Sequence, residues 1–407
     1  MAKREISQSS LSALADLLDE LLQKHIVAAW FPRSVDPAGG FHESMGTDWA
    51  ILREPRRSTV YQSRMTWIAA SLGRAGIDSP LDFCEISRDG ARFLGRNLID
   101  EQSGAVEWGV EPAGHWGTPH HLYSVSFAVF ALAAVNSATG CARALDMAKR
   151  VFWRTDDFLY DHAHGGYFSV AQRLVLEKNR HRKDQIGIPQ HLKSQNSLLH
   201  LMEAYTELAR VWPSPDVLKR LAELIDIVKL RLFAPEGRLY EMTEADWTPA
   251  SDVQTFGHDI EVSHLLIEAE LTCRGEVSGD TWTRARMLLD HTVQFGWDAR
   301  NDTIFSSSRD RESKTWWVQV EGLLGVISGL RIPGAPHDTY LELAQRLLTS
   351  IDRLFVDELF GGLHESVSAQ GVPVRSNKAH SWKAAYHDGR AFLHGSRILR
   401  ELSAAGT

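Results

Sequence analysis

A short element that recurs six times along the chain constrains the fold more than any other feature of this sequence. Each copy is a turn, usually with Asp and Gly, followed by alternating apolar or aromatic residues. The copies begin at positions 36, 100, 161, 235, 298 and 357, so successive copies start 59 to 74 residues apart. The first and last contain GGFHES (39–44) and GGLHES (361–366), which differ at one residue of six. Such regularity predicts a repeat architecture with one structural unit per copy.

The segments between the turns have the apolar spacing of helices, with room for two helices each. Residues 11–26 carry Leu and Ile at intervals of three and four, which predicts a helix with one apolar face. Segments 120–136 and 315–330 follow repeated turns and are apolar on nearly all sides, so we expect them to be buried. Six helices of each kind predict an all-α fold, an (α/α)6 barrel of twelve helices with short β-hairpin-like turns at one end.

An open solenoid is the alternative arrangement of the same repeats. Closure is favoured because the first and last turns are so similar, as neighbours in a ring can be, and because the terminal repeats do not look like polar caps. A chain of 407 residues has room for two or three domains. Closure of the repeats instead predicts a single catalytic domain over 1–407.

Charge and composition narrow the partners. The 44 basic and 52 acidic residues give a net charge of -8, which argues against nucleic acid or an anionic membrane surface. The polar N-terminus and the lack of an apolar run near ~20 residues predict a cytoplasmic protein. Cys84, Cys141 and Cys273 show no pairing or metal-type spacing, which suits a reducing compartment. The oligomeric state, including a homodimer, is left open.

In such a barrel the repeated turns lead into six inner helices, whose N-terminal turns converge on one mouth. We therefore expect the chemistry there. The candidate residues are Arg64, Tyr123, Asn196, His200, His258, Glu261, Trp316, Trp317, Glu321, Trp382 and His387. Indoles cover the C–H faces of a sugar while imidazoles, a guanidinium and carboxylates bind its hydroxyls, so this set predicts a neutral sugar as the small-molecule substrate.

No cofactor motif is present, neither a glycine-rich phosphate or dinucleotide loop nor HExxH, so no cofactor is expected. His258 and Glu261 stand one helical turn apart, but a zinc site usually needs three or four ligands, and no metal is expected. We expect Glu261 to orient or charge a histidine instead. His120, His121, His162 and His164 are expected to be structural.

Four segments carry a family resemblance: NSLLHLMEAY (196–205), FGHDIE (256–261), WWVQVE (316–321) and WKAAYHDGR (382–390). They resemble the N-acylglucosamine 2-epimerase superfamily, and most of all its branch of cellobiose 2-epimerases, mannose 2-epimerases and mannose isomerases. The resemblance covers nearly the whole chain and implies an (α/α)6 barrel without metal or nicotinamide. It also implies that His258 and His387 are the general acid/base pair on opposite faces of the sugar. Arg64 and His200 then hold the substrate oxygens and help to open the ring.

Two departures from the family bear on the substrate. The loop that begins at Gln185 has no carboxylate after Asp184, where cellobiose epimerases carry an acidic residue that holds the second sugar, and this weakens the prediction of a disaccharide. His264 stands where relatives commonly place tryptophan, which predicts an altered pocket wall.

The chemistry predicts an isomerase. Removing the C2 proton of an open-chain aldose forms an enediolate, which needs a cation and hydrogen-bond donors already in place, and Arg64, Tyr123 and Asn196 are candidates. Inverting C2 needs a base on one face and an acid on the other, and imidazole with a pKa near ~6.5 serves as either. We expect a cofactor-independent 2-epimerase for a glucose- or mannose-type sugar. The alternatives are an aldose–ketose isomerase converting mannose to fructose, a glycoside hydrolase or lyase using Glu261 and Glu321, and a sugar-binding protein without catalysis.

Overall fold

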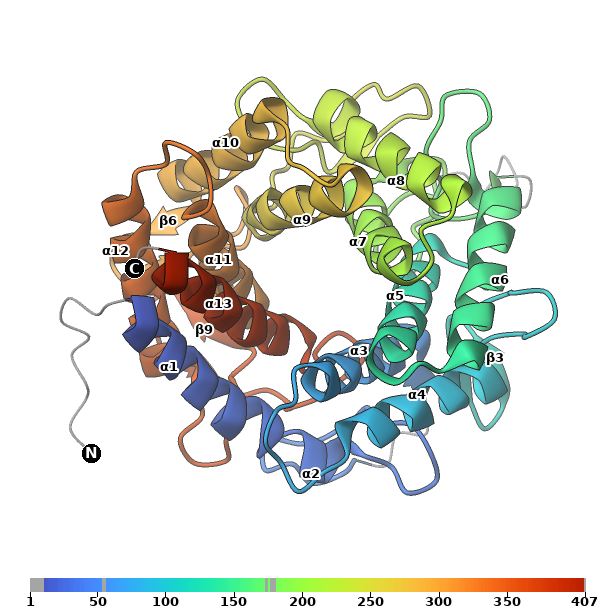
Figure 1. Ribbon diagram of the computed structural model, residues 1–407, viewed down its shortest axis with the longest axis horizontal. Coiled ribbons are helices and arrows are strands. Elements are labelled where there is room, and N and C mark those ends of the chain that lie inside the picture. Colours follow the sequence, from blue (N-terminus) through green and yellow to red (C-terminus); the bar gives the residue numbers. More distant parts are fainter. Residues whose placement is uncertain (1–10, 53–55, 173–174, 176–180, 406–407) are drawn as a thin grey trace.

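The computed structural model describes residues 11–52, 56–172, 175 and 181–405. Its helices form two concentric rings (Figure 1). The inner ring consists of α3 (Thr59–Arg74), α5 (Leu122–Thr139), α7 (Gln195–Val211), α9 (Phe256–Arg274), α11 (Trp316–Gly329) and α13 (Tyr386–Ala405). The outer ring consists of α1 (Leu11–Leu21), α4 (Phe83–Asn97), α6 (Ala142–Leu159), α8 (Pro215–Ile227), α10 (Gly279–Gly296) and α12 (His337–Ser350).

The inner ring is closed. Each inner helix packs against the next one, and α13 packs against α3. Each outer helix packs on the inner helix that precedes it in the chain, except α1, which packs on α13 at the other end of the sequence. The predicted (α/α)6 barrel is confirmed and the open solenoid is wrong. The assignment of residues 1–407 to one domain stays a prediction, which a single cooperative unfolding transition would test.

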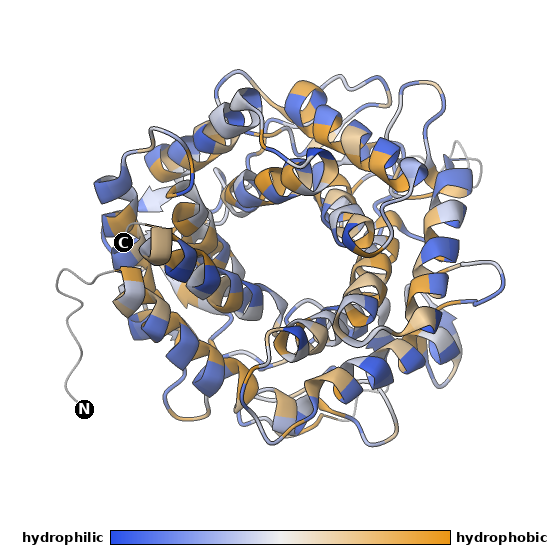
Figure 2. Ribbon diagram, in the orientation of Figure 1, coloured by the Kyte–Doolittle hydropathy of each residue, from blue (hydrophilic) through white to orange (hydrophobic). Residues whose placement is uncertain are grey.

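The burial of the two rings follows the predicted patterns. In α5 every residue from Leu122 to Val135 is buried, as expected for a helix covered on all sides. In α4 the buried residues recur at intervals of three and four on one face, and Figure 2 shows hydrophilic residues along the rest of the outer helices. Within the described part of the chain, α5 is the one helix long and apolar enough to cross a membrane. Its place between α3, α6 and α7 accounts for that composition.

Three outer helices end in π-helical turns rather than continuing as regular α-helices. These turns are Leu22–Val27 after α1, Val228–Leu232 after α8 and Ile351–Phe355 after α12. The single helix predicted over 11–26 is therefore an α-helix followed by a wider turn, and a short helix, α2 (Phe31–Ser34), comes after it.

All six repeated turns form the same antiparallel hairpin. The residues paired across them are Val35 and Phe41, Ile99 and Val106, Tyr160 and Tyr167, Phe233 and Leu239, Trp297 and Ile304, and Val356 and Leu363. The second glycine of three copies, Gly40, Gly166 and Gly362, has φ between 69° and 70°, a left-handed conformation that favours glycine. The repeat read from the sequence is thus a repeat in the structure.

Short antiparallel sheets lie at the same end of the barrel. Their strands are β1 (Arg57–Ser58), β2 (Gly109–Glu111), β3 (Gly114–Trp116), β4 (Lys193–Ser194), β5 (Met242–Thr243), β6 (Trp297–Asp298), β7 (Thr303–Ile304), β8 (Ser313–Thr315), β9 (Ser366–Ser368) and β10 (Pro373–Val374). The sheet orders are β1-β2-β3, β4-β5, β6-β7 and β10-β9-β8. Arg57 pairs with Val110 and Lys314 with Val367. Strands β1, β4 and β8 run directly into α3, α7 and α11.

Buried ion pairs tie these strands to the repeated turns. Lys193 Nζ lies 2.8 Å from an oxygen of Asp161, and Lys314 Nζ lies 2.6 Å from one of Asp298. Each lysine comes two residues before the start of an inner helix, and each aspartate begins a repeated turn. The pairs therefore fix where the first turns of α7 and α11 stand, and those turns carry candidate site residues.

Candidate active site

A cavity of about 380 Å³ lies at the mouth where the inner helices begin. Its lining residues are Arg64, Tyr123, Gln185, Ile186, Asn196, His200, His258, Glu261, Thr315, Trp316, Trp317, Glu365, Trp382 and His387. The structure thus brings together every predicted site residue except Glu321, which is fully buried behind the cavity wall.

Local capping explains how the first helical turns are held at this mouth. The Ser194 hydroxyl accepts a hydrogen bond from the backbone N–H of Ser197 at the start of α7. At the start of α5 the His121 ring accepts one from the backbone N–H of Tyr123, and its other ring nitrogen lies 3.0 Å from Asp184. His121 is therefore structural, as predicted.

Tryptophan side chains form much of the cavity wall. The Trp317 ring lies 5.1 Å from the His258 ring and 5.4 Å from the His387 ring, measured between centroids, with a 37° tilt to each. Trp382 is 42% exposed and lies at the opening. Trp316 is buried, with the Lys383 ammonium 5.5 Å from its ring centroid. Trp317 and Trp382 thus offer indole faces to the cavity.

His387 is held by a buried carboxylate. Its Nδ1 lies 2.7 Å from Oε1 of Glu321, and the other Glu321 oxygen lies 3.0 Å from Nε2 of His264. Arg390 also donates to Oε1 of Glu321 at 2.6 Å. Glu261, which the sequence suggested as the residue that orients a histidine, instead accepts a hydrogen bond from Arg390. The carboxylate that orients a catalytic candidate is therefore Glu321.

A second carboxylate holds His200. The Nδ1 of His200 lies 3.1 Å from Oε2 of Glu203, and both oxygens of Glu203 accept from the Tyr386 hydroxyl at 2.7 Å. Arg390 also donates to Glu203. One buried guanidinium thus bridges Glu203, Glu261 and Glu321, and the first and last of these contact the two histidines.

Burial and this network set the charge states of the site. Burial lowers the pKa of His258 to about 4, against a smaller opposing effect of Glu261. Burial also lowers the pKa of His387, although the Glu321 carboxylate acts in the opposite direction. Burial alone would raise the pKa of Glu203, but Arg390, His200 and Tyr386 together outweigh it and the pKa falls to about 2. Glu203 is therefore ionised and His258 is neutral at neutral pH.

Arg64 and Asn196 supply polar groups to the same cavity. Arg64 donates to the Tyr123 hydroxyl at 2.8 Å and to the Trp382 carbonyl at 3.1 Å. Within the described residues, the buried Oδ1 of Asn196 has no hydrogen-bond partner. Both side chains can bind substrate oxygens.

The residues that are grouped like metal ligands already bind a positively charged side chain, the Arg390 guanidinium. Glu261, Glu321 and His387 offer ligand atoms within 4.8 Å of one another, but Arg390 already donates to both carboxylates. His258 is not part of this cluster; its Nδ1 lies 3.0 Å from the Thr255 hydroxyl. The donor set therefore suits a guanidinium better than a metal ion.

An adjoining cavity of about 200 Å³ continues past Trp382 and Gln185. Trp108 and Trp116 line it, and the Trp108 ring centroid lies 6.2 Å from that of Trp382. Neither tryptophan was predicted from the sequence, because both precede an inner helix rather than beginning one. Gln185 belongs to the loop that has no carboxylate after Asp184.

Other functional residues were also missed, or were placed differently. Arg390 and Tyr386 lie within residues 382–390, one of the segments that resemble the family. Glu203 lies three residues after His200, a spacing that puts both on one helix face. His264 does not line the sugar cavity as the departure from the family suggested; it contacts Glu321 from the far side.

Comparisons with known proteins show the family of this chain. The N-acylglucosamine 2-epimerase (GlcNAc 2-epimerase) family matches residues 39–391, and the chain belongs to this family. It is an isomerase-class enzyme, a sugar epimerase or isomerase. A cellobiose 2-epimerase of Ruminococcus albus is 26% identical over 383 residues, covering 91% of this chain and 95% of that protein. A D-mannose isomerase of Marinomonas mediterranea is 20% identical over 392 residues, covering 90% and 94%. The solved cellobiose 2-epimerase of Spirochaeta thermophila has a TM-score of 0.85 at 27% identity, covering 97% and 98%.

Proposed function

We propose that this protein is a cofactor-independent 2-epimerase, which inverts C2 of a glucose- or mannose-type aldose by proton transfer between His258 and His387. The observation that carries the proposal is that both imidazoles line one cavity and contact the same indole, Trp317, while coming from different helices. Two bases across one cavity can reach opposite faces of one carbon.

The surroundings of the two histidines differ in the protonation state that they favour. His258 is buried with a neutral partner, the Thr255 hydroxyl, so it favours the neutral base form. His387 has the Glu321 carboxylate on Nδ1, which opposes the effect of burial on its pKa, so of the two imidazoles it holds a proton more readily. In the active form that we propose, the pair carries one proton in total, and the two nitrogens exchange base and acid roles between the two reaction directions.

The reaction begins with the open-chain aldose. One imidazole removes the C2 proton, the C–H electron pair forms the C1–C2 double bond, and the negative charge falls on O1. Arg64 and the Asn196 side chain bind the oxygens, so that charge develops beside a cation and a hydrogen-bonding group. The other imidazole then delivers its proton to the opposite face of C2, and the C1 carbonyl re-forms. His200, held by Glu203, is proposed to assist ring opening.

The two carboxylates argue against glycoside hydrolysis. Hydrolysis needs a pair of opposed carboxyl groups facing the scissile bond. Glu261 and Glu321 instead converge on one guanidinium, that of Arg390, and Glu321 does not line the cavity. The two carboxylates are thus part of one network centred on Arg390.

The adjoining cavity supports a second sugar unit on the substrate. Trp108, Trp116 and Trp382 offer indole faces next to the main cavity, so a disaccharide can extend there without the carboxylate that the loop lacks. The relatives named above include a cellobiose 2-epimerase and a mannose isomerase, so the experiment includes both a disaccharide and monosaccharides.

Product analysis in D2O tests the proposal. The purified protein with EDTA is incubated with mannose, glucose, cellobiose and N-acetylglucosamine, and products are identified by NMR. We expect the C2 epimer of at least one sugar, with deuterium at C2. A ketose as the main product would assign the aldose–ketose isomerase instead. No turnover of any of the four would overturn the proposal.

A further inference from the structure

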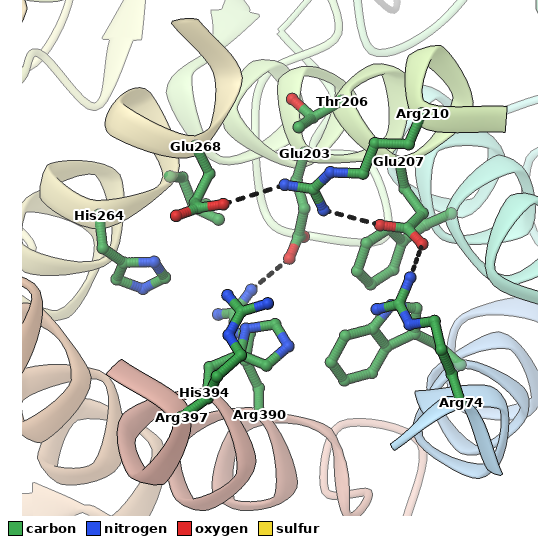
Figure 3. A pocket seen from close by; sticks show the side chains of 13 residues that line it. Arg74, Glu203, Thr206, Glu207, Arg210, His264, Glu268, Arg390, His394 and Arg397 are labelled. Atoms are coloured by element: carbon green, nitrogen blue, oxygen red, sulfur yellow. Dashed lines mark hydrogen bonds and ion pairs between the residues drawn. The ribbon is translucent and has the colours of Figure 1, made fainter. Parts of the chain in front are cut away.

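The barrel contains a further pocket, lined by later turns of inner helices whose first turns line the main cavity (Figure 3). Arg74 is the last residue of α3, Arg210 is the residue before the last of α7, and Arg397 lies beyond the middle of α13. Its accessible volume is about 60 Å³, so it can hold a group the size of a few water molecules.

The pocket gathers positive charge. Arg74, Arg210, Arg390 and Arg397 line it together with His394. These residues come from three helices, and Figure 3 shows their side chains directed toward a common space. No feature of the proposed epimerase reaction requires Arg74, Arg210 or Arg397 here.

Three carboxylates also line the pocket, and each already has a guanidinium partner. Glu207 pairs with Arg74 and with Arg210, at 2.9 Å in each case. Glu268 pairs with Arg210 at 3.0 Å and with Arg331 at 2.8 Å. Figure 3 marks the Arg74–Glu207–Arg210–Glu268 chain with dashed lines.

The third carboxylate, Glu203, is paired with Arg390 as described above. The remaining titratable group on the wall, His264, contacts Glu321. Among the hydrogen-bond donors on the pocket wall, Arg397 and His394 therefore have the fewest polar contacts with the protein. Within the described residues, the ion pair of Arg397 is a single contact of 3.7 Å with Glu401 on the exposed side of α13.

His394 has no hydrogen bond within the described part of the chain; it contacts the Trp67 ring, with centroids 6.0 Å apart. Burial lowers its pKa well below the ordinary value, and Arg397, Arg390, Arg210 and Arg74 all act in the same direction. The imidazole is therefore neutral, and the positive charge of the arginines around it is what a bound anion would offset.

We propose that this pocket binds a small oxyanion, of the size and charge of inorganic phosphate, on Arg397 and His394 with Arg74 and Arg210 at its edge. Guanidinium groups bind oxyanions through paired, charge-assisted hydrogen bonds. The ligand is then the free ion or a phosphoryl group presented from outside the pocket.

Calorimetric titration of the full chain with inorganic phosphate, at ionic strength held constant with NaCl, tests the site. We expect saturable binding to one site, weakened about tenfold or more by R397Q. The matched control is R400Q, which removes the same charge from the same helix but pairs with Asp16 and Asp19 outside the pocket. No saturable binding, or equal binding by R397Q and the unaltered protein, would overturn the proposal.

The titration of His394, followed by NMR of 15N-histidine-labelled protein and assigned with H394Q, gives a second readout. Saturating phosphate is expected to raise its pKa, and R400Q is expected to show the same rise. An unchanged pKa in the presence of bound phosphate would place the ion elsewhere and overturn the site. Glucose 6-phosphate in parallel separates a free ion from a phosphoryl group, and either result supports the site. Neither readout involves sugar turnover, so failure here is distinct from failure of the proposed epimerase function.

Discussion

His387 and Glu321 are hydrogen-bonded at 2.7 Å between Nδ1 and Oε1, although 66 residues separate them in the sequence. The bond fixes the orientation of the imidazole and leaves Nε2 as the nitrogen free for substrate. It also places a full negative charge next to the ring, because the Arg390 guanidinium helps to hold the pKa of Glu321 well below its ordinary value despite burial. This is the arrangement that lets a buried histidine carry a proton.

Replacing Glu321 by Gln is expected to lower kcat by about 10²-fold, the usual contribution of a positioned acid or base. KM should change little, because Glu321 does not line the cavity. Steady-state kinetics on the sugar identified as substrate measure both constants.

The matched control for this variant is E223Q. Glu223 is a partly buried carboxylate that also has an arginine partner, Arg220 at 2.9 Å, but it belongs to the outer helix α8. A large rise in KM with unchanged kcat for E321Q would show that Glu321 binds substrate directly, contrary to its place in this structure.

The pH profile of kcat/KM is expected to be bell-shaped, since the active histidine pair carries one proton. Burial lowers the pKa of His258 to about 4, so the acid limb should lie well below the ~6.5 of free imidazole. In E321Q the imidazolium of His387 loses its carboxylate, its pKa falls further, and the alkaline limb should move to lower pH. An alkaline limb that moves upward would contradict the role given to Glu321.

Arg390 is expected to be essential for stability. It bridges three buried carboxylates, so R390Q leaves those charges without their common partner and should lower the free energy of unfolding by about 3–5 kcal/mol. Urea unfolding at pH 7.5 measures the change. R400Q on the same helix removes a half-exposed arginine and should cost much less.

The loss in R390Q should also shrink in acid. The pKa of Glu203 is about 2 in the intact protein, so its ion pair stabilises the fold above the ~4.3 of an unfolded glutamate and that stability is lost as pH falls toward 2. Without Arg390, burial raises this pKa, and protonation relieves the buried charge. Unfolding at pH 5 should therefore show a smaller difference between R390Q and the unaltered protein than at pH 7.5, and a larger one would contradict the network.

Trp382 is expected to act in binding. Removing its indole by W382A should raise KM about tenfold, equivalent to ~1.4 kcal/mol of lost contact, with a smaller effect on kcat. W153A is the matched control, because Trp153 is 45% exposed against 42% for Trp382 but lies on the outer helix α6. Equal effects of the two variants would contradict a sugar-binding role for Trp382.

The ring of helices and the position of the site at its mouth could be predicted because both follow from local sequence patterns. The repeated hairpins recur at a regular spacing, and residues such as His258 and His387 fall in the first turn of a buried helix. Helix periodicity and dipole direction then bring them to one end without knowledge of any pairwise contact.

The network behind the histidines could not be predicted in the same way. Arg390 contacts Glu203 across 187 residues and Glu261 across 129, and neither pairing leaves a local pattern. Glu261 was expected to orient or charge a histidine. Its charge does act on the pKa of His258, but its hydrogen bond is to Arg390, and the carboxylate that orients His387 is Glu321. The arginine pocket was missed for the same reason, since its members come from later turns of separate helices.

Solvent exchange by single-histidine variants tests the central claim most directly. H258Q and H387Q are each incubated in D2O with both C2 epimers of the identified substrate, and deuterium at C2 of the unreacted sugar is measured by NMR. Because each imidazole serves one face of C2, each variant should exchange the C2 proton of one epimer alone, the two variants should choose opposite epimers, and neither should epimerise. A variant that exchanges both epimers, or that still interconverts them, would contradict the two-histidine account.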